Sequence, residues 1–289
     1  MTGEAAFEEI NEAKATMDHI YNQHDPRAYF RELTKLEYVI PGRAKPIFQK
    51  LIRHLQAQRE DPVHILDLGC SYGVNAALLK RDLSMADLYE HWGQKKLVGV
   101  TPEEVTACDH SFFASPEKPN DIKMIGLDQA ENAIAYAEEA GLLDEGLAVD
   151  LETEQLSAQA EAQLKPVDLI VSTGCVGYVT KTSFERLLPA VTHGRAPWLA
   201  NFVLRMFPFD EIEETLKDWG YVTEKLKGRT FVQRDFASAD EQAQVLEQLR
   251  EQGVDPKGKE TGGHLHAEFY LSRPMKDAAE IPIDRLLSA

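Results

Sequence analysis

The chain has 289 residues, with 31 Lys or Arg against 48 Asp or Glu, which gives a formal net charge of −17 at pH 7. A chain of this length can bury a large core and hold one large α/β domain with additions. Nucleic acids and anionic membrane surfaces are bound mainly through Lys and Arg, so the acidic excess argues against both as partners.

The cysteines and the hydropathy pattern argue against several further classes. Cys70, Cys108 and Cys175 are widely spaced and form no Cys-x-x-Cys pair, which predicts neither a disulfide framework nor a metal site. Early acidic residues and the lack of any run of about 18 apolar residues predict neither a secretion signal nor a membrane span. We therefore expect a cytoplasmic protein.

The first 60 residues are predicted to be helical. Apolar residues spaced by three and four predict an amphipathic helix over residues 5–21. Asp25 and Pro26 are suited to begin a second helix, as its cap and its first residue, and a third helix is expected over residues 44–58. We expect residues 1–60 to form a lid.

Three side chains of this region are candidates for contact with a bound cofactor. Tyr21, Arg27 and Tyr29 combine aromatic faces with a cation, which suits stacking on a base, contact with a positive charge and pairing with a carboxylate. The alternative is a helical extension in which the tyrosines only pack.

Residues 64–79 predict a buried strand, a tight turn and the start of a helix. Asp67 ends the strand, and Gly69, Ser71 and Gly73 follow in the turn. The backbone N–H groups ahead of a helix favour an anion, whereas the carboxylate of Asp67 repels a pyrophosphate and attracts an ammonium group. A ligand that carries both charges, such as an amino acid, therefore fits this turn best.

The pattern Asp-x-Gly-x-Ser-x-Gly resembles the first motif of the class I S-adenosylmethionine (SAM) dependent methyltransferases, with Ser71 where the middle glycine is usual. Ser is small enough to keep a close approach to the ligand, and the Gly-x-Gly-x-x-Gly pattern of NAD-binding folds is absent. The resemblance implies SAM as the cofactor, bound by Asp67, Gly69, Cys70, Ser71 and Gly73. A strand-helix turn that binds nothing is the alternative.

A second acidic strand end lies far downstream. In a plain βαβ unit the acid that ends the second strand follows about 20 residues after the first glycine turn. Here the strand over residues 123–128 ends in Asp128, much farther from Asp67. Residues 82–120 are therefore predicted to be an insertion with two short helices. The resemblance places Asp128, with Gln129 beside it, at the ribose hydroxyls. A capping or surface role for Asp128 is the alternative.

The third and fourth strands complete the expected cofactor site. Residues 146–152 predict a strand, and the resemblance places Asp150 and the backbone amide of Leu151 at the adenine. Residues 167–174 predict a strand buried on both faces, which ends in Thr173 and Gly174. Ligands of open α/β sheets bind at such carboxyl ends.

The segment after the fourth strand carries the candidates for catalysis. It lacks the Asn/Asp-Pro-Pro-aromatic motif of the methyltransferases that modify amino groups and DNA, which disfavours N-methylation of nucleobases. Tyr178 and Tyr72 are the candidates to border the reacting sulfur, with a core or lid role as the alternative for each.

The remaining chain closes the sheet. Strands are expected over residues 198–205, 221–227 and 263–272, with a long loop between the last two that suggests an antiparallel hairpin. The predicted fold is a Rossmann-like, doubly wound α/β sheet of seven strands with a C-terminal antiparallel hairpin, a helical N-terminal lid and a helical insertion. Residues 61–274 would form the SAM-binding domain and residues 275–289 a tail.

Three functions are compatible with a SAM site of this kind. The resemblance favours methyl transfer to a small molecule, with no nucleic acid or membrane partner. The first alternative is a cyclase that converts SAM to azetidine-2-carboxylate and releases methylthioadenosine, since azetidine-2-carboxylate synthases share the methyltransferase-like fold. The second alternative is a protein that binds SAM without catalysis. The sequence predicts no oligomeric state.

Overall fold

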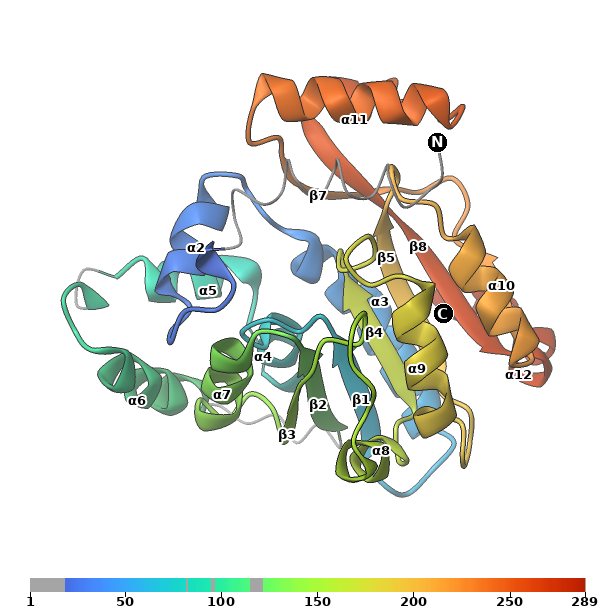
Figure 1. The fold of residues 1–289 in the computed structure, drawn as a ribbon, viewed down its shortest axis with the longest axis horizontal. Coiled ribbons are helices and arrows are strands. Elements are labelled where there is room, and N and C mark those ends of the chain that lie inside the picture. The colour runs from blue at the N-terminus through green and yellow to red at the C-terminus, as the bar shows by residue number, and fades with distance from the viewer. Residues whose placement is uncertain (1–18, 82, 95–96, 115–121, 289) are drawn as a thin grey trace.

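The structure, a computed structural model, describes residues 19–81, 83–94, 97–114 and 122–288. In this part of the chain eight strands form one sheet, with the order β3-β2-β1-β4-β5-β8-β6 and with β7 paired to β8 (Figure 1). The strands are β1 (Val63–Leu68), β2 (Ile122–Asp128), β3 (Glu145–Ala148), β4 (Leu169–Thr173), β5 (Trp198–Leu204), β6 (Tyr221–Lys225), β7 (Phe231–Asp235) and β8 (His264–Pro274).

The strand pairing gives the sheet its Rossmann-like character. Strands β1 to β5 pair in parallel, whereas β8 is antiparallel to β5, β6 and β7. Strand β1 lies between β2 and β4, so the chain winds outward in both directions from this point. Ligands of such sheets bind at the carboxyl ends of the strands beside this switch point. The predicted doubly wound α/β class is confirmed.

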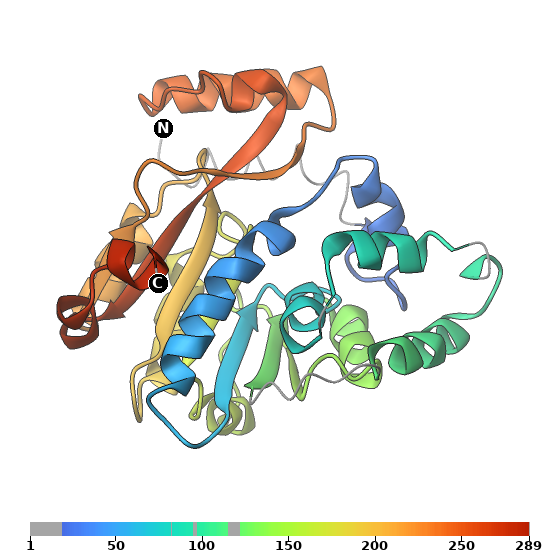
Figure 2. The same ribbon diagram turned by 180° about the vertical axis from the view of Figure 1, so that it is seen from behind.

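Helices cover both faces of the sheet because its central strands are apolar on both sides. Ile65 and Leu66, adjacent on β1, belong to the two different hydrophobic cores. Figure 2 shows the long helix α3 running across one face. That face is covered by α3 (Ile40–Gln56), α4 (Val74–Lys80), α7 (Glu131–Glu139) and α13 (Ile283–Ser288), and the other by α8 (Ala158–Leu164), α9 (Lys181–Val191), α10 (Asp210–Asp218) and α11 (Ala239–Glu251).

The region predicted as a long loop before the last strand contains β7 and α11, so the sheet has eight strands rather than seven. β6 and β7 lie along the same edge of β8, because β6 pairs with its second half and β7 with its first. Strand β7 is short and polar, and α11 buries few apolar side chains, Val245 and Leu249 among them. A weak apolar pattern of this kind does not distinguish a strand and a helix from a loop.

The N-terminal region divides into two parts. The predicted helix over residues 5–21 lies almost wholly outside the described residues, and α2 (Arg27–Thr34) begins one residue after Pro26. Helix α3 begins at Ile40, earlier than expected, and buries eight of its residues. It is therefore part of the helical layer that covers the sheet. Only the segment ahead of α3 remains a candidate for the predicted lid.

The insertion and the C-terminus are both helical. The insertion holds α5 (Met85–Trp92) and α6 (Pro102–Phe113), each of which begins with a capping box. The segment expected to be a tail instead forms α12 (Met275–Glu280) and α13, because Ile283 and Leu286 are apolar and join the core beside α3. Among the described residues, no helix has the length and apolarity needed to cross a membrane.

Candidate functional site

A cavity of about 600 Å³ opens at the carboxyl ends of β1, β2, β3 and β4. Its volume falls in the range of roughly 300–1,000 Å³ that is usual for small-molecule sites. It is lined by Tyr21, Asn22, Tyr29, Tyr38, Leu68, Gly69, Ser71, Leu127, Asp128, Gln129, Ala130, Val149, Asp150, Leu151, Glu152, Thr173, Gly174, Cys175, Tyr178, Val179, Ser183 and Gln233.

The turn after β1 is built from residues with left-handed backbone conformation. Gly69, Ser71 and Gly73 have φ angles of +70°, +48° and +75°. A side chain at Gly69 would place its Cβ 2.5 Å from Cβ of Cys175, so glycine is required here for packing as well as for the turn. Ser71 adopts a conformation that costs a residue with a side chain roughly 1–2 kcal/mol.

Asp128 holds this turn from the end of β2. Its Oδ2 accepts a hydrogen bond from the backbone N–H of Ser71 at 2.8 Å, and its Oδ1 accepts one from Ala130 at 3.0 Å. Burial raises the pKa of the Asp128 carboxyl, although these backbone donors oppose the change. The carboxylate therefore fixes the turn and also lines the cavity.

Asp67 lies beneath the cavity rather than in its lining. Its side chain is fully buried, and its Oδ1 accepts from Nδ2 of Asn75 at 2.9 Å. The same amide nitrogen donates to Oγ1 of Thr173, which does line the cavity, at 3.1 Å. Oδ2 of Asp67 has no hydrogen-bond partner within the described ranges. Burial raises the pKa of this carboxyl to about 7, and the nearby charge of Asp128 adds to the rise.

The loop after β3 forms one rim of the cavity. Asp150 accepts hydrogen bonds from the backbone N–H of Glu152 at 2.9 Å and from Oγ1 of Thr153 at 2.8 Å. Glu152 in turn accepts from the backbone N–H and the hydroxyl of Thr180, at 2.9 and 2.7 Å. These bonds fix the position of the acidic rim.

Four tyrosines form aromatic walls. The ring of Tyr29 makes T-shaped contacts with the rings of Tyr21 and Tyr38, with centroids 5.6 and 6.4 Å apart. Burial raises the pKa of the Tyr29 hydroxyl, so this wall is uncharged at neutral pH. Tyr178, in the loop after β4, is 38 % exposed and is the most accessible of the predicted site tyrosines that line the cavity.

Most of the residues predicted for the cofactor or for catalysis line this one cavity. They are Tyr21, Tyr29, Gly69, Ser71, Asp128, Gln129, Asp150, Leu151, Thr173, Gly174 and Tyr178. Five others do not line it: Arg27, Asp67, Cys70, Tyr72 and Gly73.

Cys70 and Tyr72 point away from the cavity. Sγ of Cys70 lies 2.8 Å from the position that a Cβ on Gly126 would occupy, so the thiol packs against β2. The hydroxyl of Tyr72 accepts from the backbone N–H of Gln23 at 2.7 Å and lies 3.0 Å from the carbonyl oxygen of Ile20. Tyr72 therefore anchors the N-terminal segment, and its predicted place at the reacting sulfur does not match this geometry.

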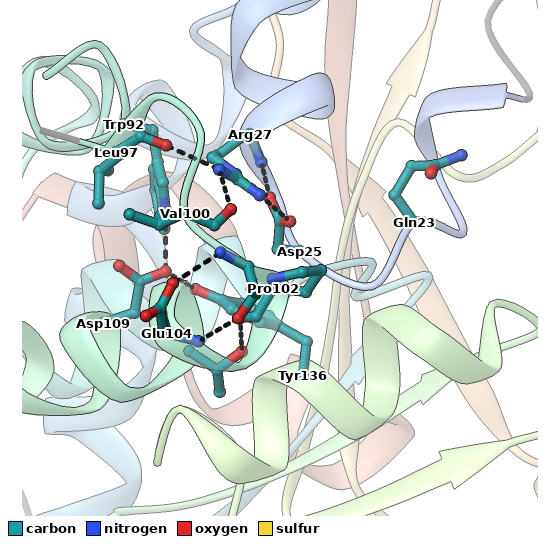
Figure 3. A network of polar contacts seen from close by, with 12 residues as sticks. Gln23, Asp25, Arg27, Trp92, Leu97, Val100, Pro102, Glu104, Asp109 and Tyr136 are labelled. Carbon is teal, nitrogen blue, oxygen red and sulfur yellow. Dashed lines mark hydrogen bonds and ion pairs between the residues drawn. The ribbon is translucent and has the colours of Figure 1, made fainter. Parts of the chain in front are cut away.

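Arg27 joins the N-terminal segment to the insertion (Figure 3). Its guanidinium forms an ion pair with Asp25 and donates to the carbonyl oxygens of Leu97 at 2.7 Å and Val100 at 3.1 Å. Although burial acts to raise the pKa of the Asp25 carboxyl, the bonds from Arg27 outweigh it and lower that pKa. The guanidinium is thus engaged by the protein itself rather than directed into the cavity.

Figure 3 also shows a buried carboxylate beside this junction. Asp109 of α6 is fully buried and accepts hydrogen bonds from Trp92 Nε1 at 3.0 Å and from the hydroxyl of Tyr136 at 2.6 Å. His91 Nε2 lies 2.6 Å from its other oxygen. These contacts bind α5, α6 and α7 together, so the insertion is held firmly against the domain that carries the site.

The sequence did not single out several lining residues. Cys175 directly follows the predicted Gly174, in the segment expected to face the reacting centre, but it is not among the predicted site residues. Tyr38 lies in the same tyrosine-rich region as Tyr29, and this position in the sequence could have indicated that it lines the cavity. No sequence pattern indicated that Gln233 lines the cavity, because its strand was not predicted.

Two lining residues carry buried polar atoms that have no partner among the described residues. Oγ of Ser71 and Oε1 of Gln233 are inaccessible and, within the described part of the chain, accept or donate no hydrogen bond. A second cavity of about 630 Å³ lies between α2 and α5, where Arg27, Phe30 and Trp92 are among its lining residues. None of its described lining residues has such an atom, which favours the first cavity as the functional site.

The fold is similar to those of solved methyltransferases. The plantazolicin methyltransferase BamL, solved with a triazolic desmethylPZN analog and SAH, is 13% identical, with a TM-score of 0.50, and the match covers 94% of this chain and 99% of that chain. The magnesium protoporphyrin IX methyltransferase ChlM from Synechocystis PCC 6803 is 11% identical, with a TM-score of 0.37 and coverage of 79% of each chain.

A TehB-like SAM-dependent methyltransferase from Corynebacterium glutamicum is 15% identical, with a TM-score of 0.37 and coverage of 76% of this chain and 86% of that chain. No protein-family model and no curated protein matches this sequence. At these low identities the similarity to BamL shows the fold of the chain and nothing finer.

Proposed function

We propose that the chain is a SAM-dependent methyltransferase that acts on a small molecule. The observation that carries the proposal is the turn after β1, where the left-handed Ser71 lines the cavity and is fixed by Asp128, and where its buried hydroxyl has no partner among the described residues. Polar atoms that are buried without partners cost free energy, and a ligand that bonds to them removes this cost.

The charges of the cavity suit the cofactor. Its described lining residues include Asp128, Asp150 and Glu152 but no Lys, Arg or His. SAM carries a sulfonium and an ammonium group, which such a lining attracts. In this assignment Asp128 binds the ribose hydroxyls, Asp150 and the Leu151 amide bind the adenine, and the turn residues bind the amino-acid end. Asp67 lies beneath that end, and one of its carboxylate oxygens has no partner among the residues that the structure describes.

SAM, when bound, supplies a methyl group on a positively charged sulfur, and the protein has mainly to align it with the acceptor. The tyrosine walls offer electron-rich faces to a cation. Asn22 and Tyr21 are held over the cavity because Oδ1 and the carbonyl oxygen of Asn22 accept from Asn132 at 2.9 and 3.0 Å. The N-terminal segment would thus act as a lid that excludes water from the site.

The solved structures support methyl transfer through the fold alone, and this fold does not separate methyl transfer from the cyclase alternative. BamL is a methyltransferase solved with SAH, and a shared fold is compatible with a shared cofactor. No contact in the described part of the chain favours cyclisation of SAM to azetidine-2-carboxylate, which is therefore kept as an outcome of the experiment and not as a second proposal.

Calorimetry with SAM and SAH tests the cofactor assignment. We expect both to bind the wild-type chain, and we expect Asp128→Ala to weaken SAM binding by roughly 1–3 kcal/mol through lost charge-assisted hydrogen bonds. Asp61→Asn is the matched control, because Asp61 is an exposed acid before β1, at the opposite edge of the sheet. Equal losses in the two variants would show a general charge effect and would contradict the assignment.

Mass spectrometry of the products tests the reaction. Methyl transfer leaves S-adenosylhomocysteine only when an acceptor is present, so the chain with SAM alone should release no product above the spontaneous background. Release of methylthioadenosine from SAM alone would instead establish cyclisation. Binding of SAM with neither product, across a broad panel of small amines, phenols and thiols, would favour a non-catalytic SAM-binding protein.

A further inference from the structure

Gln233 occupies an irregularity of the strand that the sequence did not predict. On β7, Val232 pairs with His266 and Arg234 pairs with Leu265, so Gln233 between them has no opposite residue on β8. This is a β-bulge, which redirects a side chain and is often found beside active sites.

The bulge places the Gln233 side chain over the end of β4. A Cβ on Gly174 would lie 2.6 Å from Nε2 of Gln233, so the absence of a side chain at Gly174 makes room for the carboxamide. The backbone is fixed on the outer edge of β7, because the carbonyl oxygen of Gln233 accepts from the N–H of Val39 at 2.8 Å and the N–H of Asp235 donates to Leu36 at 2.7 Å. Tyr38, between these two contacts, lines the same cavity.

The carboxamide is buried without satisfying its hydrogen bonds. Gln233 is 7 % exposed, and its Oε1 has no hydrogen-bond partner in the parts of the chain that the structure describes. The backbone contacts that fix β7 hold this unsatisfied group at the cavity wall. A ligand group that donates an N–H or O–H would satisfy Oε1.

The position of Gln233 in the sheet separates it from Asp128, Asp150 and the turn at Ser71, which are expected cofactor contacts, although it lies beside Gly174, which is another. Asp128, Asp150 and the turn at Ser71 belong to the side of the sheet formed by β1, β2 and β3. Gln233 enters from β7, beyond β4, β5 and β8 in the strand order. The two sets of polar groups thus face the cavity from opposite sides of the switch point.

We propose that Gln233 binds the methyl-accepting molecule, and that this acceptor is a small molecule that donates an N–H or O–H to Gln233 and carries no negative charge. The acidic lining, with no basic side chain among its described residues, disfavours an acceptor with a carboxylate or phosphate. This inference rests on the proposed function, because only a methyltransferase has a methyl-accepting substrate. The hydrogen-bonding preference of the Gln233 subsite is a property of the chain that is measured separately.

The experiment follows the side-chain amide signals of Gln233 by NMR in the full chain. Gln233→Leu, which keeps the approximate size of the side chain, identifies these signals by their loss. Gln248→Leu identifies matched control signals, because Gln248 also has a buried Oε1 without a partner in the described ranges but does not line the cavity. The probes are acetamide, N,N-dimethylacetamide and acetate, which differ in hydrogen-bond donors and charge but are similar in size. Each is titrated with and without SAH.

We expect acetamide to shift the Gln233 signals with and without SAH, with an affinity about tenfold above those of dimethylacetamide and acetate. The Gln248 signals should not move. An equal or larger response to acetate, or no response to acetamide up to its solubility limit, would overturn the proposal. A tenfold loss of SAH affinity in Gln233→Leu would also overturn it, because Gln233 would then belong to the cofactor. Failure of SAH to bind the wild-type chain would instead contradict the proposed function, while the acetamide titration of the free chain would still test Gln233.

Discussion

The backbone N–H of Ser71 donates a 2.8 Å hydrogen bond to Oδ2 of Asp128, which joins the turn after β1 to the end of β2. Ser71 needs this support because its φ of +48° is in the left-handed region, where a residue with a side chain is strained. Its hydroxyl is buried and has no partner among the described residues. The turn therefore stores a small strain at the place where the cofactor is proposed to bind.

Ser71→Gly should stabilise the ligand-free protein. Glycine adopts this conformation without strain, and we expect the free energy of unfolding to rise by roughly 0.5–1 kcal/mol after the entropic cost of glycine in the unfolded chain. Ser71→Ala, which keeps the strain and removes only the hydroxyl, is the matched control. Thermal unfolding measures both. Equal stabilisation by the two variants would show that the hydroxyl, and not the backbone conformation, carries the cost.

The raised pKa of Asp67 predicts how stability and cofactor affinity change with pH. Between its ordinary value near 4 and the folded value of about 7, the folded protein holds a proton that the unfolded chain has lost. The stability of the ligand-free protein should therefore fall as pH rises through this window. Asp67→Asn should remove that fall, so thermal unfolding at pH 5 and pH 8 should differ less than in the wild type.

Binding of a cation beside Asp67 has the opposite pH dependence, because it favours the ionised carboxylate. SAM affinity should rise from pH 5 to pH 8 and binding should release a proton, which calorimetry in buffers of different ionisation enthalpy detects. Asp67→Asn should abolish the proton release, whereas the exposed Asp61→Asn should not. Unchanged proton release in Asp67→Asn would assign it to another group, and the candidate is Asp128, which lines the cavity and whose pKa is also raised.

How far the sequence predicted the site depended on how strongly each segment is patterned. The glycine turn and the strands that follow it have apolar runs and positive-φ positions that local rules recognise, and the residues named there from Gly69 to Gly174 largely line one cavity. Gln233 was not predictable, because its strand is five residues long, polar and bulged. Its place in the cavity depends on pairing with β8, a tertiary contact that no local pattern shows.

The direction of side chains was the second feature that the sequence could not predict. Tyr72 and Arg27 lie in segments that border the cavity, but the hydroxyl of Tyr72 bonds to residues 20 and 23 and the guanidinium of Arg27 bonds to residues 25, 97 and 100. Apart from Asp25, these partners come from distant parts of the chain. Residue type and spacing indicate that such groups need partners, but they do not indicate which partners the fold supplies.

The contacts of Tyr72 predict a role in holding the lid. Tyr72→Phe removes the hydroxyl that bonds to Gln23, and we expect hydrogen–deuterium exchange in residues 20–30 to accelerate about tenfold through more frequent local opening. The rate of SAM dissociation, measured by stopped-flow fluorescence, should rise in the same variant. Loss of turnover with unchanged exchange would instead restore the catalytic role that the sequence suggested for this tyrosine.

Tyr178 offers a test of whether an aromatic wall contacts the sulfonium. SAM carries a positive sulfur and SAH a neutral one, so the ratio of their affinities reports on contact between a tyrosine face and the charge without any need for an acceptor. Tyr178 lines the cavity at the end of β4 and is 38 % exposed, for which a cation–π contact is worth about 0.5–1 kcal/mol. Tyr178→Ala should therefore lower SAM affinity roughly two- to fivefold relative to SAH. Tyr178→Phe is the matched control and should keep the wild-type ratio, because the ring is retained. Calorimetry with both ligands gives the ratios, and equal losses of SAM and SAH affinity in Tyr178→Ala would show that Tyr178 shapes the cavity without contacting the charge.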